Sequence, residues 1–175
     1  MDTGLWKYLW IQNNVLKIVA SEDREFQRKF NAFYRVRKNE NWQKKFYSLL
    51  QAEKNKKPNF QKILLDLFTR TKRIEASFSS KLTATINTRL PVIDSIVLKN
   101  LREMGHINMR LPYYYIPATE RISKIVELHK NLEKLFNNFL RTPNGKYLIK
   151  EFKKMYPWAK ITYQKMLDLV LWQKR

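Results

Sequence analysis

Large apolar residues recur at intervals of three and four along this chain, and that spacing limits the fold more than any other feature. Phe26, Phe30 and Phe33 illustrate it, and they follow Ser21, a residue type suited to capping the first turn of a helix. Further runs with the same period begin after Asn41, after Asn59, at Thr119 and near Thr162. The period predicts about eight or nine α-helices and no strand. The expected fold class is therefore all-α.

A few segments interrupt the helical pattern. The chain has only three glycines, too few for the tight turns of a hairpin-rich sheet. Lys54–Pro58 (KNKKP) predicts a polar linker between helices, and Gly105–Pro117, with its two prolines and three consecutive tyrosines, predicts an ordered loop. Pro143 and Gly145 break the long helix that begins at Thr119.

The length of 175 residues suits one compact helical domain, residues 1–175, with two possible lobes. The expected lobes are residues 60–117 and residues 1–59 together with 118–175. No apolar run approaches the ~18 to 20 residues that span a bilayer. The N-terminal segment MDTGLWKYLWIQNN has no charged start, apolar middle or small-residue cleavage site, so we expect no signal peptide and a cytoplasmic protein.

Positive charge dominates the composition. Lys and Arg total 35 against 15 Asp and Glu, a formal net charge of +20. Eleven basic residues lie between Arg24 and Lys57, against three acidic ones, and nine follow from Arg141 onward, against two. If the two ends of the chain meet, they form one positive face, for which a phosphate backbone is the natural partner.

Solubility and membrane binding are the alternatives to nucleic acid as a reason for this charge. Solubility alone is served by a net charge of about 2 to 8 in a small domain, well below the value here. An anionic membrane would need a helix with a basic face opposite a Trp/Leu face that is free of the core, and no segment offers one. We therefore expect no membrane partner.

Most catalytic chemistry is excluded by composition. Without cysteine there are no disulfides, thiol nucleophiles, zinc fingers or iron–sulfur clusters, and with only His106 and His129 no histidine-rich metal site is expected. No G-x-S-x-G, P-loop or dinucleotide-binding glycine motif is present, and the acidic residues are too scattered for a two-metal nuclease site. We expect no metal and no cofactor.

One carboxylate stands out from this background. Asp94 lies between Val92–Ile93 and Ile96–Val97, after Pro91, which suits the first turn of a helix whose buried face includes Val97. A carboxylate in the first turn commonly has a structural role, because its negative charge interacts favourably with the positive end of the helix dipole. In a mostly apolar setting it is also a candidate catalytic acid.

Aromatic and basic residues interleave in Phe30–Arg37 (FNAFYRVR) and Trp42–Tyr47 (WQKKFY). At helical spacing most of these aromatics are expected in the core, although exposed ones could stack on unpaired bases. Three consecutive tyrosines at 113–115 cannot all face one core, so at least one is expected at the surface. The candidates for nucleic-acid contacts are Arg35, Arg37, Lys44, Lys45, Lys99 and Tyr114.

The segment Pro91–Leu101 (PVIDSIVLKNL) resembles the part of the helix-hairpin-helix DNA glycosylases, above all the adenine glycosylases, that carries the catalytic aspartate. Upstream, Ser79–Ile86 (SSKLTATI) resembles the hairpin helix that carries a lysine nucleophile in some members, near Lys81 here. The Gly-rich hairpin turn of that family is absent, since no glycine lies between Gly4 and Gly105. The blocks FNAFYRVR, EASFSSKL and KMLDLVLW are also similar to a family of uncharacterised bacterial proteins, a similarity that implies no function.

The resemblance implies a two-lobed fold of the glycosylase type and a DNA repair enzyme that excises a damaged or modified base from double-stranded DNA. Asp94 would stabilise the positive charge that develops on the sugar of a flipped nucleotide, and Lys81 would act as nucleophile or phosphate ligand. The enzyme would act as a monomer without metal or cofactor. Two alternatives stay open: a nucleic-acid-binding protein without catalysis, in which Asp94 is structural, and a subunit whose basic face docks an acidic protein.

Overall fold

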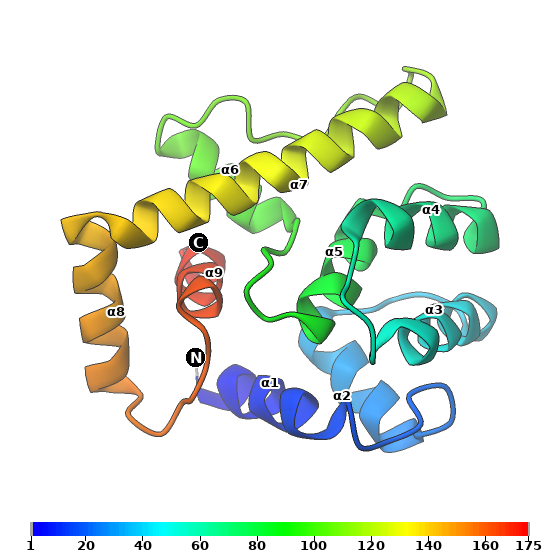
Figure 1. The fold of residues 1–175 in the computed structure, drawn as a ribbon, viewed down its shortest axis with the longest axis horizontal. Helices are drawn as coiled ribbons and strands as arrows, with labels where there is room; N and C mark the ends of the chain where they lie inside the picture. The colour runs from blue at the N-terminus through cyan, green and yellow to red at the C-terminus, as the bar shows by residue number, and fades with distance from the viewer. Residues whose placement is uncertain (1, 175) are drawn as a thin grey trace. The chain divides into compact units, whose positions relative to one another are not determined.

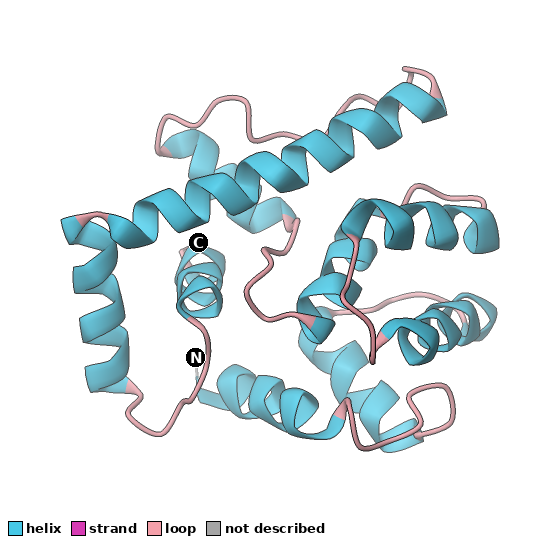
Figure 2. Ribbon diagram, viewed as in Figure 1, coloured by secondary structure: helices cyan, strands magenta, loops and turns pink. Residues whose placement is uncertain are grey.

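A computed structural model describes residues 2–174 of the chain, and these residues form nine helices and no strand (Figures 1 and 2). The all-α prediction is confirmed. The helices are α1 (Asp2–Asn14), α2 (Arg24–Tyr34), α3 (Glu40–Glu53), α4 (Phe60–Thr71), α5 (Ala76–Ile86), α6 (Ser95–Glu103), α7 (Ala118–Arg141), α8 (Pro143–Met155) and α9 (Tyr163–Gln173). Among the described residues, no helix combines the length and the apolar character needed to cross a bilayer.

The chain divides into two compact units, Met1–Asn87 with α1 to α5 and Thr88–Arg175 with α6 to α9. We call them unit 1 and unit 2 and describe each by itself. The lobes expected from the sequence have other boundaries and stay a prediction.

Unit 1 is built around an aromatic core. Phe26, Phe30, Phe46 and Tyr47 are almost completely buried, and Trp42 stacks on Phe46 with ring centroids 5.2 Å apart. Each buried aromatic side chain removes on the order of 150 to 250 Å² from water, so this cluster dominates the stability of the unit. The expectation that most aromatics of the two basic segments belong to the core is confirmed.

Unit 2 is organised around α9, which packs against α6, α7 and α8. Nearly every residue from Lys165 to Leu171 is buried, including the ion pair between Lys165 Nζ and Asp168 Oδ2 at 2.6 Å. At the end of α9, the Asn100 side chain on α6 donates hydrogen bonds to the carbonyls of Leu171 and Lys174. These bonds satisfy carbonyls that lack a partner within the helix.

The starts of several helices differ from the sequence-based expectation. α2 is capped by Asp23, whose Oδ1 accepts from Phe26 N at 2.7 Å, and not by Ser21. α3 is capped by Asn39, two residues before the expected Asn41. Pro91 does not lie in a helix, because α6 begins only after Asp94. In each case the residue with an extended backbone and an acceptor aimed at the next turn decides the start.

A sharp corner joins the long helix α7 to α8 (Figure 1). Thr142 has an extended backbone and caps α8, with its Oγ1 accepting from Gly145 N at 3.1 Å. A Cβ on Gly145 would lie 2.1 Å from the carbonyl oxygen of Phe139 and 2.7 Å from Cα of Leu140. The first turn of α8 therefore approaches α7 more closely than any residue other than glycine allows. The predicted break of the long helix at Pro143 and Gly145 is confirmed.

We expect Gly145→Ala to lower the free energy of unfolding by about 2 kcal/mol, because the methyl group meets backbone that cannot move independently. The matched control is Gly4→Ala, since a Cβ at Gly4 meets nothing within 4 Å. That control should raise the stability by up to about 1 kcal/mol through helix propensity. Urea unfolding of both variants measures the difference, and equal stabilities would contradict the close approach at the corner.

Candidate nucleic-acid interface

Asp94 is the N-cap of α6. Its backbone is extended, with φ −125° and ψ 140°, and its Oδ1 accepts a hydrogen bond from Ile96 N at 2.9 Å. The side chain is half-buried, beside the buried residues Val92 and Ile93. The structure thus gives one carboxylate oxygen a structural role, while Oδ2 makes no hydrogen bond within the described part of the chain. A catalytic role for Asp94 stays a prediction.

Lys81 lies on α5 in unit 1 and is 9% exposed. Its Nζ donates to the carbonyl oxygen of Tyr34 at 3.2 Å and lies 5.1 Å from the ring centroid of Phe78. Tyr34 is the last residue of α2, so the ammonium group compensates the negative end of that helix. This contact ties α5 to α2 and gives Lys81 a structural use in unit 1. Its role as nucleophile or phosphate ligand remains a prediction.

The arginines and lysines predicted to contact nucleic acid differ in their exposure and in whether an acidic side chain pairs with them. Arg35 and Arg37 are exposed, and Arg35 ends α2 in the left-handed conformation with φ 53°. Lys44 is exposed but pairs with Glu40 at 3.2 Å, and that hydrogen bond and charge hold the pKa of Glu40 below its ordinary value. Lys45 is half-buried on α3, and Lys99 on α6 lies 3.6 Å from a carboxylate oxygen of the next turn, Glu103.

A stronger basic surface lies on α8, within the basic run that follows Arg141 but not singled out from the sequence. Lys146, Lys150, Lys153 and Lys154 are all exposed, and we call this set the lysine face. Lys146, Lys150 and Lys154 recur every four residues and so share one side of the helix. The buried residues Gly145 and Phe152 belong to the opposite side. The sequence shows both the lysines at intervals of four and the Phe on the opposite side of the helix, so this surface could have been predicted from the sequence.

The lysine face lacks the neutralisation found on other helices. In the described part of the chain, five helices place an acid and a base four residues apart in an ion pair, as Lys99 and Glu103 do on α6. Within the described residues, Lys146, Lys150 and Lys154 form no ion pair. Like charges four residues apart cost about 0.2 to 0.5 kcal/mol per pair, so an anion bound here would relieve repulsion that the fold itself leaves in place.

All three tyrosines of the loop that precedes α7 are exposed: Tyr113 is 57%, Tyr114 83% and Tyr115 70% exposed. Tyr113 and Tyr115 stack on each other at 5.3 Å, with 12° between their planes. Arg121 Nη1 on α7 donates to the carbonyl of Tyr114 at 3.4 Å. The prediction that at least one tyrosine reaches the surface is confirmed, and the Tyr114 ring faces solvent as a stacking residue must.

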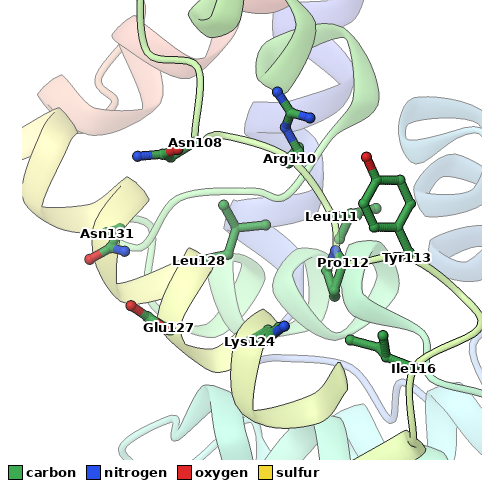
Figure 3. A pocket seen from close by; sticks show the side chains of 10 residues that line it. All are labelled: Asn108, Arg110, Leu111, Pro112, Tyr113, Ile116, Lys124, Glu127, Leu128 and Asn131. Atoms are coloured by element: carbon green, nitrogen blue, oxygen red, sulfur yellow. The ribbon is translucent and has the colours of Figure 1, made fainter. Parts of the chain in front are cut away.

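A cavity of about 400 Å³ lies between this loop and the middle of α7 (Figure 3). Its apolar lining consists of Leu111, Pro112, Ile116 and Leu128. Polar and charged side chains complete the lining: Asn108, Arg110, Tyr113, Lys124, Glu127 and Asn131. The loop is held in place from α6, where Arg102 Nη1 donates to the carbonyl of the buried Met109 at 2.8 Å. No signal in the sequence marked this cavity.

His129 on α7 is 3% exposed and belongs to the interior of unit 2. Burial lowers the pKa of its imidazole from 6.5 to about 4, and a hydrogen bond with the backbone of Pro91 opposes that shift only in part. His129 is therefore neutral at pH 7. Among the described residues no group of three or more His, Asp or Glu side chains is placed to hold a metal ion.

We expect the free energy of unfolding to fall by about 3 kcal/mol between pH 7 and pH 4 on account of His129 alone. Its folded pKa of about 4 lies below the unfolded value of 6.5, so the unfolded chain binds the proton first as the pH falls. The stabilisation is complete above pH 6.5 and is lost as the pH approaches 4. Denaturant unfolding across this window should show a shallower pH slope for His129→Leu than for His106→Gln, whose side chain is exposed. Equal slopes would contradict the buried neutral imidazole.

We expect Asp94→Ala to lower the free energy of unfolding by about 1 kcal/mol, because the Ile96 amide loses its acceptor. Asp94→Asn keeps an acceptor at the cap and should change stability by only a few tenths of a kcal/mol. Ser95→Ala, at the exposed neighbouring position, is the control. An unchanged stability in Asp94→Ala would show that the cap contributes nothing.

Comparison of this chain with protein-family models, with curated proteins and with solved structures found no match. The resemblance of Pro91–Leu101 to the DNA glycosylases stays a prediction. A function for this chain therefore has to be argued from the charges, the cavity and the exposed aromatic rings of the two units.

Proposed function

We propose that this chain binds nucleic acid through the lysine face of α8. The observation that carries the proposal is the series Lys146, Lys150 and Lys154, three exposed lysines repeated every four residues that form no ion pair among the described residues. A nucleic-acid strand is the common polyanion whose charges are also regularly spaced. Binding would exchange lysine–lysine repulsion for phosphate contacts and release the counterions held by the strand.

The dimensions of α8 suit a phosphate backbone. At a rise of 1.5 Å per residue, Lys146 and Lys154 are separated by about 12 Å along the helix axis. A duplex strand carries one charge per about 3.4 Å of its axis, so the lysine face is long enough to meet three or four phosphates. Lys153 Nζ also contacts Tyr163, lying 3.1 Å from its hydroxyl and 4.7 Å from its ring centroid. This contact holds one cation of the face in a fixed position.

The burial of α8 favours nucleic acid over a membrane surface. A helix that lies in a bilayer interface inserts its apolar side between the lipids. In α8 that side is occupied by the protein, because Phe152 is 3% exposed and packs with Tyr156 at a ring separation of 5.1 Å. The buried side of α8 is therefore not available for insertion, and the large apolar side chains that α8 does expose are Tyr147 and Met155.

Removing the lysine face should weaken binding to a short fluorescent DNA duplex and make it less sensitive to salt. The variant replaces Lys146, Lys150 and Lys154 with Gln. Because each lost phosphate contact removes about 0.9 from the log–log salt slope, we expect the slope to fall by about 3. Fluorescence anisotropy titrations at several salt concentrations measure both effects.

A charge-matched control separates the lysine face from net charge. Arg24, Lys29 and Lys62 are at least partly exposed, and each forms an ion pair with an acidic side chain. Replacing these three with Gln removes the same formal charge but should lower the slope by less than about 1. Equal losses in the two variants would mean that affinity follows net charge alone. An unchanged slope in the first variant would also overturn the proposal.

Excision of a base is the second candidate function, because Oδ2 of Asp94 makes no hydrogen bond among the described residues and its segment resembles the glycosylase motif. Asp94→Asn should keep the cap of α6 and the affinity for DNA while abolishing base release. Release of a modified base by this variant at the rate of the unaltered chain would exclude the catalytic role and leave the binding function intact.

A further inference from the structure

We propose that the cavity between residues 108–116 and α7 binds one unstacked nucleobase that carries an exocyclic amino group, with its phosphate at the rim. The site would hold a single nucleotide of the strand that the chain binds, so this inference deepens the proposed function and rests on it. The cavity belongs wholly to unit 2 (Figure 3).

The size and the walls of the cavity fit one base. About 400 Å³ lies near the lower end of the 300 to 1,000 Å³ typical of small-molecule sites. Figure 3 shows Leu128 of α7 near the middle of the site, with Pro112 and Ile116 on the loop side. Aliphatic side chains of this kind offer the flat faces of a base a surface away from water.

The polar lining supplies hydrogen-bonding groups that the fold leaves unused. Figure 3 shows Asn108, Asn131 and Glu127 along one edge of the site. Their side chains make no hydrogen bond or ion pair within 4 Å among the described residues. An amide both donates and accepts, whereas an ionised carboxylate only accepts. Glu127 therefore selects for a ligand with an N–H donor, such as the amino group of cytosine or adenine.

A phosphate would meet cations at the rim. Arg110 is exposed, and its Nε donates to the carbonyl of Ile107 at 3.3 Å, which orients the guanidinium. Its terminal amino groups make no hydrogen bond or ion pair with the part of the chain that the structure describes. Lys124 Nζ lies 2.7 Å from Glu120, and hydrogen bonding to that carboxylate raises the pKa of Lys124. Lys124 is thus charged but already paired, so Arg110 is the residue we assign to the phosphate.

The tyrosines extend the site along a strand. Tyr113 lines the cavity and stacks on Tyr115, whose side chain is 70% exposed. A base next to the bound one could stack on these rings, a contact worth about 1 to 3 kcal/mol in other single-strand binders. Stacking on a base would give these exposed tyrosines a function, since they do not contribute to the core.

Cytidine 5′-monophosphate and its analogue with hydrogen in place of the 4-amino group test the proposal, since these two nucleotides differ only in that amino group. Titration calorimetry on the full chain should show the cytidine nucleotide binding about tenfold more tightly, the effect of one hydrogen bond to a charged acceptor. Glu127→Gln should remove most of this preference, because a neutral amide oxygen accepts from the amino group more weakly than a carboxylate does. Equal affinities for the two nucleotides, or no heat with either at millimolar concentration, would overturn the inference.

Two substitutions on one helix provide the matched control. Asn131→Leu removes an amide from the lining, while Asn138→Leu makes the same change at an exposed position of α7 outside the cavity. The first should weaken cytidine 5′-monophosphate about fivefold or more and the second should leave it unchanged. Equal effects would contradict the site.

The failure of this inference is distinct from the failure of the proposed function. If the lysine-face variant loses duplex affinity and the cytidine nucleotide does not bind, the cavity proposal alone is wrong. If the cytidine nucleotide binds with the expected preference and the lysine-face variant binds DNA normally, the cavity stands and the assignment of α8 is wrong.

Discussion

Repulsion among 35 basic side chains, with 15 acidic ones to offset them, is the constraint on which the structure depends. Single acids serve more than one cation: Glu53 Oε1 lies 2.9 Å from Lys56 Nζ and 2.8 Å from Lys62 Nζ. Asp23 and Asp94 are used as helix caps. The acids are thus largely committed to holding helices and connections, and some of the remaining cations are exposed without an ion pair. The lysine face of α8, a helix with Glu151 as its one acid, is the clearest such place among the described residues.

Some of the basic residues are not available to any partner, because they stabilise the interior. Lys54 is 6% exposed, and its Nζ donates to the carbonyls of Val15 and Ile18, which closes the connection that follows α1. Lys81 holds the end of α2 in the same manner. A buried ammonium is costly unless its donors are satisfied, so these contacts are conditions for the fold of unit 1. Net charge alone therefore overstates the surface that can meet a polyanion.

Most of the helices were predictable because a helix that packs on a core needs a periodic apolar stripe, which the sequence displays directly. The first helix, α1, was not predicted from such a stripe. The first residue of each helix was less predictable. Ser21 and Asp23 are equally good caps by residue type, as are Asn39 and Asn41, and only the path of the backbone distinguishes them. Asp94 shows the same limit, because its segment predicted a charge near a helix start without revealing which residue begins the helix. The cavity was out of reach, since it depends on how the loop before α7 is tethered through Arg102, a contact between residues that no local pattern relates.

Unit 2 joins the two proposed surfaces through one rigid element. Residues 124–131, in the middle of α7, line the cavity, and the last residue of the helix, Arg141, leads through the Gly145 corner into the lysine face. From Leu128 to Arg141 the helix rises by about 20 Å, a length that does not change while α7 stays helical. A strand bound at both proposed surfaces would have to cover this distance. The length of α7 and the close contact at Gly145 would then determine how many nucleotides separate those held by the lysines from the one that enters the cavity.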